Sequence, residues 1–251
     1  MGFSLATAEG FFANMERRLV ILGIETSVEN VGVALGDHNG IRATASISSD
    51  RKHAESLTPM IQFVMQQAES SMSDISAIAV DIGPGLFTGM RVGIATAQSL
   101  AWALEVPVIP VCSLDALAQT VAWSDSPIVA SLDARRGEVY WALYRARGQE
   151  LQRIVEPTVT SPDDLAIHIA DRAEEVVCVG TGFKRYADTF EANPWGQIIG
   201  GDSLFPTASA VVTLGASALL NDNTVAPDNV EPMYLRVPDA EINWKTREAT
   251  P

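Results

Sequence analysis

Two short stretches of the chain combine residue types that could bind phosphate. The first, "GIETS", places the carboxyl group of Glu25 and the hydroxyl groups of Thr26 and Ser27 directly after an apolar run. A carboxylate followed by hydroxyls is typical of a metal–nucleotide pocket, because Mg²⁺ prefers oxygen ligands and phosphate partners. Polar residues that simply end a strand before a hairpin explain the same pattern, and this stretch alone leaves both interpretations open.

The second stretch is "DIGPGLFTGMRVGIA", residues 81–95. Its Gly83 and Gly85 permit a sharp turn that exposes consecutive N–H groups. If Thr88 caps the helix that follows, the positive end of the helix dipole faces any anion held there. A tight corner without a ligand accounts equally well for the glycines, so this stretch is a second candidate for a nucleotide or anion site.

Other catalytic patterns are missing from the sequence. None of the three histidines has another histidine or a cysteine three or four residues away, so no helix face carries a zinc-type pair. The motifs GxSxG, HExxH and GxxxxGK[ST] do not occur. The sequence therefore disfavours a serine-triad hydrolase and a histidine-based metal enzyme, and we expect no metal site.

The charge balance bears on contact with nucleic acid. Seventeen basic residues against thirty-one acidic residues give a formal net charge of −14. Because affinity for nucleic acid depends on neutralising phosphates, this chain is poorly suited to be a main RNA-binding surface, although acidity also serves solubility alone. If RNA takes part in the function, we expect only indirect contact.

The cysteines and the apolar runs indicate the compartment. Cys112 and Cys178 lie in apolar surroundings and indicate neither a disulfide scaffold nor a metal site. The longest apolar region is interrupted by Gln98, Glu105 and two prolines, which argues against a membrane span. The first eighteen residues lack the pattern of a secretory signal. We expect a cytoplasmic protein without membrane contact.

The elements that must position these residues alternate between strands and helices. Apolar runs and alternating patterns predict strands, and apolar residues at three- and four-residue steps predict helices. The order indicates an α/β fold built from two units, each a mixed sheet covered by helices. The expected strands are 18–27, 30–48 as a hairpin, 75–82, 106–111, 127–134, 138–146, 150–157 and 175–180, and the expected helices are 54–70, 90–104, 113–123, 161–171 and 208–220.

Small side chains recur every fourth residue along the helix expected at 90–104. Such a strip lets another helix approach closely. Glycine costs about 1 kcal/mol per interior helix position relative to alanine, so two glycines on one face indicate a packing reason. The strip and the apolar stripe of the helix at 54–70 could form half of an intermolecular four-helix contact, or they could fill the chain's own core. The residues concerned are Gly89, Gly93, Ala97 and Ala101, with Leu57, Met60, Ile61, Val64 and Met65.

Six motifs in order resemble the TsaB (YeaZ) family over residues 19–236: "ILGIETS", "HAESLTPMI", "GPGLFTGMRVGIATAQSLAW", "VPVIPVCSLDALA", "DARRGEVYWALY" and "PMYLR". The resemblance implies two actin/hexokinase/Hsp70-like lobes. It implies a first lobe of residues 19–112 plus 208–236 and a second lobe of residues 113–207. Residues 1–18 would be a flexible extension and residues 237–251 a flexible tail.

The same resemblance implies a function and partners. The family belongs to the bacterial machinery that forms threonylcarbamoyladenosine in tRNA, as the scaffold paralogue of a catalytic TsaD-like subunit, together with a TsaE-like ATPase. We expect a non-catalytic subunit that pairs through the two helices, forms a homodimer when alone, meets tRNA only through the complex, and binds no cofactor tightly, with ATP or ADP joining in the complex. His53 and Arg91 complete the expected interface.

Departures from related patterns support the scaffold role. TsaD-like chains carry two metal-binding histidines four residues apart where this chain aligns Ser113 and Leu117, and leucine cannot bind a metal. The family usually has Asp at Glu25 and Ser at Leu86, which weakens the case for independent nucleotide binding. An ATPase or small-molecule kinase of the same fold is the alternative, and a metallopeptidase is a third hypothesis that the missing histidine pair disfavours.

Overall fold

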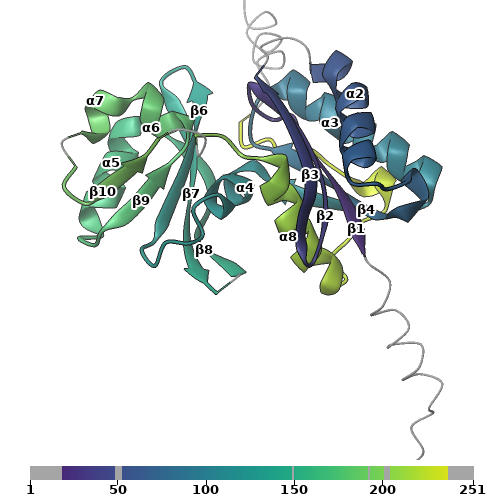
Figure 1. Cartoon of the computed structure of the whole chain (residues 1–251). Coiled ribbons are helices and arrows are strands. Elements are labelled where there is room, and N and C mark those ends of the chain that lie inside the picture. The colour runs from purple at the N-terminus through teal and green to yellow at the C-terminus, as the bar shows by residue number, and fades with distance from the viewer. Residues whose placement is uncertain (1–18, 49–52, 149, 192, 201–203, 237–251) are drawn as a thin grey trace, which may run out of the picture.

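The computed structural model describes residues 19–48, 53–148, 150–191, 193–200 and 204–236. Within these ranges the chain forms two five-stranded sheets that lie side by side, each with helices packed on both faces (Figure 1). The expected extension at residues 1–18 and the expected tail at residues 237–251 lie outside the described residues. The prediction of two lobes, each a mixed sheet with packed helices, is confirmed.

The first sheet has the strand order β3-β2-β1-β4-β5. Strand β1 pairs antiparallel with β2 and parallel with β4, so the sheet is mixed. The two neighbouring strands β4 and β5 are parallel, and their connection contains a helix, as a parallel crossover requires. The strands are β1 (Val20–Glu25), β2 (Asn30–Asp37), β3 (Gly40–Ser48), β4 (Ile75–Gly83) and β5 (Val108–Cys112).

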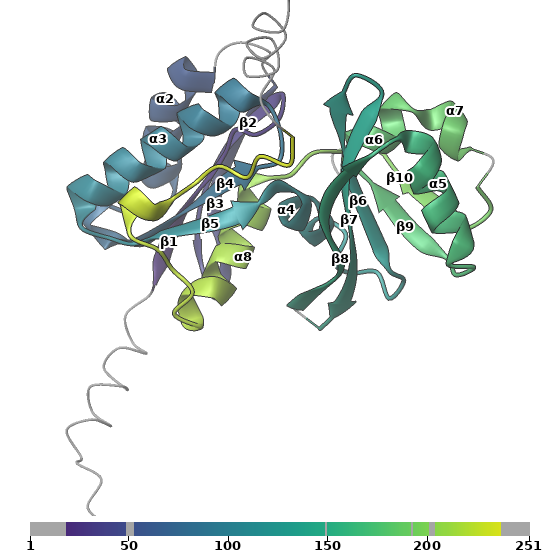
Figure 2. The same ribbon diagram turned by 180° about the vertical axis from the view of Figure 1, so that it is seen from behind.

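Successive side chains of the buried strands point to opposite faces of the first sheet, and both faces are apolar. Leu22 and Ile78 contribute to the core under α2 (His53–Gln67) and α3 (Phe87–Leu104). Their neighbours Ile21 and Ala79 face the opposite side, where α8 (Ala208–Leu220) packs. Figures 1 and 2 show α2 and α3 together on one face of the sheet and α8 on the other. Helix α8 has the predicted bounds, although it is far from this lobe in sequence. Short 3₁₀ turns occur at η1 (Met72–Asp74) and η3 (Pro227–Asn229).

The second sheet has the order β10-β9-β6-β7-β8. One face packs against α4 and the other against α5, α6 and α7. Ser161 caps α5 as expected, because its hydroxyl accepts a hydrogen bond from the Asp164 N–H at 3.1 Å. The sequence did not predict α6, α7 or β10. The bounds are β6 (Ile128–Arg135), β7 (Glu138–Arg147), β8 (Glu150–Thr160), β9 (Val176–Val179), β10 (Gly196–Ile199), α4 (Ser113–Gln119), α5 (Pro162–Asp171), α6 (Thr181–Arg185) and α7 (Ala187–Phe190).

Helix α4 lies where the two lobes meet. It contacts β4 and β5 of the first sheet as well as β6, β7 and β8 of the second. Its Asp115 accepts hydrogen bonds from the Tyr144 hydroxyl at 2.8 Å and from Nε of Arg153 at 2.9 Å, which fix α4 to the second sheet. None of the helices that the structure describes is both long enough and apolar enough to cross a membrane.

Candidate functional site

The strip of small residues on α3 faces the chain's own sheet. Gly89, Gly93, Ala97 and Ala101 are all buried in the core of the first lobe. A Cβ atom at Gly93 would overlap Oγ1 of Thr26, whose hydroxyl donates a hydrogen bond of 2.8 Å to the Gly89 carbonyl. The expectation that this strip receives a partner helix is therefore wrong: the spacing reports close packing between α3 and the end of β1.

The apolar stripe of α2 is also internal. Leu57, Met60, Ile61, Val64 and Met65 are each at most 7% exposed and belong to the first-lobe core. They form a shared face as the spacing predicts, but that face packs on the sheet and is not available to a partner. The expectation that these five residues contact a partner is therefore also wrong, because they pack against the chain's own sheet. His53 is the first residue of α2, and its side chain lies outside what the structure describes.

The opposite sides of the two helices are exposed. Phe63 on α2 is 50% exposed and Trp102 on α3 is 60% exposed, which is high for large apolar side chains. Ala95 and Ser99 lie on the side of α3 opposite its buried residues and are also exposed. We call this surface the outer helix face and define it by six exposed residues: Pro59, Phe63, Arg91, Ala95, Ser99 and Trp102.

Arg91 belongs both to the outer helix face and to an aromatic cluster. Its guanidinium lies 4.0 Å from the centroid of the Phe87 ring, and its Nε donates a hydrogen bond of 2.9 Å to the Tyr234 hydroxyl. The Phe87 and Tyr234 rings stack with centroids 5.5 Å apart. The cluster connects the first turn of α3 to the last described segment of the chain.

The glycine turn before α3 has its own backbone groups occupied. The Gly83 N–H donates to Oδ1 of Asp81 at 2.7 Å, and the Leu86 N–H donates to the Ser27 carbonyl at 2.6 Å. A Cβ at Gly85 would overlap the Ser27 backbone, so the glycine permits this close approach. Thr88 does not cap α3, since the helix begins at Phe87 and Leu86 is the capping residue. That expectation is wrong because the helix starts earlier than predicted.

Behind this turn, the carboxyl groups of Glu25 and Asp81 form a pair that solvent does not reach. The two residues are 1% and 0% exposed. Oε1 of Glu25 accepts hydrogen bonds from the backbone N–H and the hydroxyl of Ser27, both at 2.7 Å. Oδ1 of Asp81 accepts from the Ser113 hydroxyl at 2.5 Å. Thr26 and Ser27 are fully buried as well, so the hydroxyls of "GIETS" serve the interior of the lobe.

Burial and mutual repulsion disfavour two negative charges in this pair. Burial, and then the charge of Asp81, raise the pKa of Glu25 well above its ordinary value. Burial also raises the pKa of Asp81, while hydrogen bonds from Glu25, Ser113 and Gly83 lower it. Oε2 of Glu25 is buried and has no hydrogen-bond partner among the described residues. No three His, Cys, Asp or Glu side chains gather into a metal-binding group within the described part of the chain.

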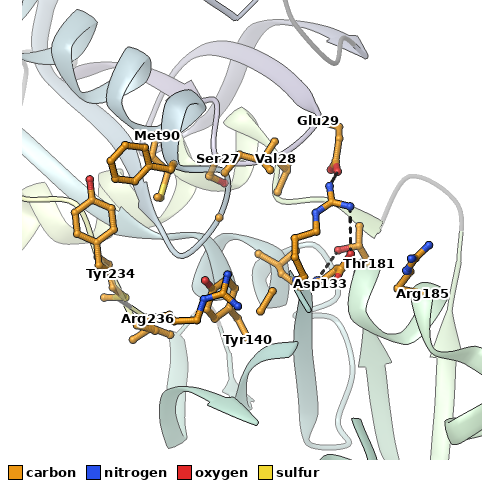
Figure 3. Close-up of a pocket in the computed structure, with 18 of the residues that line it drawn as sticks. Ser27, Val28, Glu29, Met90, Asp133, Tyr140, Thr181, Arg185, Tyr234 and Arg236 are labelled. Atoms are coloured by element: carbon orange, nitrogen blue, oxygen red, sulfur yellow. Dashed lines mark hydrogen bonds and ion pairs between the residues drawn. The ribbon is translucent and has the colours of Figure 1, made fainter. Parts of the chain in front are cut away.

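An open cavity of about 590 Å³ lies between the lobes (Figure 3). This volume is within the range of small-molecule sites, roughly 300–1,000 Å³. Of the residues expected to bind an anion, only Gly85 and Ser27 border it. Glu25, Thr26 and Gly83 lie in the interior, and Thr88 is exposed but does not line the cavity.

Most polar groups of the cavity come from segments that the sequence did not single out as a site. The second lobe supplies Asp133, Arg135, Thr181, Lys184 and Arg185. The motifs "DARRGEVYWALY" and "PMYLR" contain Asp133, Tyr140, Tyr234 and Arg236, so the resemblance pointed to these segments without giving them a role. No local spacing connects residues that lie this far apart in sequence, and only the fold brings them together.

Comparison with known proteins gives consistent results. The family model described as "TsaD: tRNA N6-adenosine threonylcarbamoyltransferase" matches residues 41–244. The tRNA threonylcarbamoyladenosine biosynthesis protein TsaB of Escherichia coli (strain K12) is 33% identical over 235 residues, covering 90% of this chain and 96% of that protein. TsaB of Bacillus subtilis (strain 168) is 28% identical over 90% of this chain and 98% of its own length.

Solved structures agree with the sequence relatives. The structure described as YeaZ from Pseudomonas aeruginosa matches with a TM-score of 0.77 and 31% identity, covering 86% of this chain and 99% of that one. A second Pseudomonas aeruginosa structure, described as having similarity to peptidase YEAZ, gives a TM-score of 0.78 at 30% identity, with coverage of 86% and 99%. The chain belongs to the TsaB (YeaZ) family of tRNA threonylcarbamoyladenosine biosynthesis proteins.

Proposed function

We propose that this chain is the non-catalytic scaffold of the complex that forms threonylcarbamoyladenosine in tRNA. The observation that carries the proposal is the match to TsaB proteins along nearly their whole length. In this proposal the chain acts in the cytoplasm, pairs with a TsaD-like catalytic paralogue, works with a TsaE-like ATPase and meets tRNA only through the complex. It binds no cofactor tightly, and ATP or ADP joins in the complex.

Helix α4 supports the non-catalytic part of the proposal. Ser113 and Leu117 occupy the positions that resemble the metal-binding histidines of TsaD-like chains, and both are fully buried. The Ser113 hydroxyl donates to Asp81, and Leu117 packs in the core of the second lobe. These positions therefore have structural roles here.

The outer helix face is the surface that we assign to partner pairing. It carries Phe63 and Trp102 as large exposed apolar groups, and side chains of this kind often dominate binding energy at protein interfaces. Ala95 and Ser99 are small, so they allow a second helix pair to approach closely. The same face would serve a homodimer of the isolated chain.

Co-purification with the TsaD-like paralogue tests the pairing. Ala95→Arg places bulk and charge on the outer helix face and is expected to abolish the complex. Ala170→Arg, at an exposed helical alanine of the second lobe, is the matched control and should leave it intact. Retention of the complex by Ala95→Arg, or equal loss in both variants, would show that the partner binds elsewhere.

Reconstitution tests the scaffold role itself. Supplied with preformed threonylcarbamoyl-adenylate as the activated donor and with ATP, the TsaD-like and TsaE-like subunits should modify tRNA only when this chain is added. The isolated chain should hydrolyse no ATP. Turnover of ATP that is lost in Glu25→Gln would instead support the ATPase or kinase alternative.

A further inference from the structure

Arg91 is the only charged residue of the outer helix face. The other residues that define this face are apolar or uncharged, and no other residue of α3 carries a charge. The whole chain is acidic, with a net charge of −14, so this cation is not part of a generally basic protein. A single exposed charge on an otherwise apolar surface needs its own account if a partner covers that surface.

No carboxylate in the described part of the chain neutralises Arg91. Its Nε donates a hydrogen bond of 2.9 Å to the hydroxyl of Tyr234, which is a neutral group. The ion pairs among the described residues do not include Arg91. Its two terminal nitrogens, Nη1 and Nη2, therefore keep their N–H donors for a group from outside the described chain.

Aromatic contacts hold the guanidinium in one place. It lies 4.0 Å from the centroid of the Phe87 ring and 6.0 Å from that of the Tyr234 ring. The two rings stack on each other, so the hydrogen bond to Tyr234 and the contact with Phe87 act on the same group. Arg91 is thus oriented before any partner arrives.

Tyr234 is itself held from both sides along the chain. The Met233 N–H donates to the Ile82 carbonyl at 2.8 Å, which fixes the preceding residue to the first lobe. Arg236 forms an ion pair of 3.0 Å with Glu138, which fixes the segment to the second lobe. A side chain oriented in this way loses little freedom when it binds, so the entropic cost of a contact to Arg91 is reduced.

A partner that covers the outer helix face removes Arg91 from water. A buried charge is tolerated only when another charge or several hydrogen bonds compensate it. The contact with Phe87 offsets only part of the lost hydration. The group that best matches the remaining N–H donors of a guanidinium is a carboxylate, because its two oxygens accept from the fork of nitrogens.

We infer that Arg91 binds a carboxylate of the TsaD-like partner, from an Asp or Glu side chain on the partner's contact surface, and that Tyr234 positions the arginine for it. The inference rests on the proposed pairing through the outer helix face and names the partner group at one point of it. A partner with an apolar or basic side chain opposite Arg91 would leave the charge unpaired, so the arginine also contributes to the choice of partner.

Surface plasmon resonance with the immobilised full chain and the TsaD-like paralogue in solution tests the inference. Arg91→Met keeps much of the side chain's length but removes its charge, and we expect the affinity to fall tenfold or more. Arg147→Met, at an exposed arginine of β7, is the matched control and should change the affinity less than twofold. An affinity of Arg91→Met within twofold of wild type would overturn the inference.

Charge reversal separates an ion pair from lost packing. Arg91→Glu should prevent pairing, and replacement of one Asp or Glu on the paralogue's contact surface by Lys should restore the affinity at least tenfold. These replacements are made one at a time. If none of them restores pairing with Arg91→Glu, no partner carboxylate binds this arginine.

A double-mutant cycle tests the positioning role of Tyr234. Tyr234→Phe removes the hydroxyl that accepts from Nε and keeps the ring, and it should weaken pairing at least twofold when Arg91 is present. The same change should have no effect in the Arg91→Met background, because the group that it positions is gone. Equal losses in both backgrounds would show that Tyr234 does not act through Arg91.

These outcomes are distinct from failure of the proposed pairing. If Ala95→Arg leaves the complex intact, the partner binds elsewhere and the pairing itself is wrong. If Ala95→Arg abolishes the complex while Arg91→Met binds as wild type does, the pairing stands and only the inference about Arg91 is wrong.

Discussion

Arg135 of the second lobe holds Glu29 of the first lobe in an ion pair of 2.8 Å across the cavity. Its own backbone is in the left-handed region, with φ of 64°, which an arginine rarely adopts. Arg135, at the end of β6, therefore has an unfavourable backbone conformation at the point where its ion pair links the two lobes.

Two substitutions at this position separate strain from pairing. Arg135→Ala should lower the free energy of unfolding by about 0.5 kcal/mol, since an exposed ion pair contributes little. Arg135→Gly should be close to wild type, because relief of the left-handed conformation, about 1 kcal/mol, offsets the lost pair. Urea unfolding followed by circular dichroism measures both. If Arg135→Gly is the less stable of the two, the backbone is not strained there.

Gly93→Ala should destabilise the protein although alanine is the better helix former. Overlap with Thr26 is expected to cost about 1–3 kcal/mol, more than the roughly 1 kcal/mol gained in helix propensity. The double variant Thr26→Ala/Gly93→Ala should recover part of the loss, because the overlapping hydroxyl is gone. A stabilised Gly93→Ala single variant would mean that α3 does not pack as described.

Glu25→Gln should change how stability depends on pH. The pKa of Glu25 is raised in the folded state, so the folded protein holds a proton that the unfolded chain releases above its ordinary pKa. Wild-type stability should therefore fall, relative to the glutamine variant, as pH rises from about 5 towards the folded-state pKa, while the two should agree at lower pH. Thermal unfolding across pH measures the difference. If the stability difference between wild type and Glu25→Gln became smaller with rising pH, the pKa of Glu25 would not be raised in the folded state.

Arg153→Met should lower the free energy of unfolding by about 1–3 kcal/mol, because it leaves the half-buried carboxylate of Asp115 with fewer partners. The hydrogen bond from Arg153 to Asp115 raises the pKa of Arg153, so the arginine stays charged in the folded state. Arg147→Met on the neighbouring strand is the control and should stay within about 0.5 kcal/mol of wild type. Equal losses in the two variants would show that α4 is not held by this pair.

Trp102→Ala should separate binding from stability. The side chain is 60% exposed, so the isolated chain should unfold within about 0.5 kcal/mol of wild type. Affinity for the TsaD-like subunit, measured by surface plasmon resonance, should fall tenfold or more if Trp102 is a main contact. Trp123→Ala, at a tryptophan that is 71% exposed and lies outside the outer helix face, is the control and should bind normally.

The sequence predicted which residues share a face better than it predicted what that face meets. Four-residue spacing identified the strip that contains Gly93, and three- and four-residue spacing identified the stripe that contains Met60. Spacing cannot distinguish a sheet of the same chain from a helix of another, and here the sheet lies against both. The exposed Phe63 and Trp102 fall outside the regular pattern, so periodicity gave no signal for them.

The cavity was harder to predict for a different reason. Glu29, Arg135, Lys184 and Tyr234 come from four distant segments, and their meeting depends on how the two lobes are joined. The alternating strands and the capped helix α5 depend on local chemistry and were predicted well. The short elements α6 and β10 are five and four residues long, too short to show a period.

Helix α8 gives the protein a particular order of folding during synthesis. It covers one face of the first sheet, yet it follows β5 by the whole second lobe. At about 5–20 residues per second, a ribosome needs several seconds to make the roughly 95 residues between them. During that interval the apolar groups of Ile21, Ala79 and Ile109 lack their cover, while the second lobe is still being synthesised. The first lobe therefore begins to form first and is completed last.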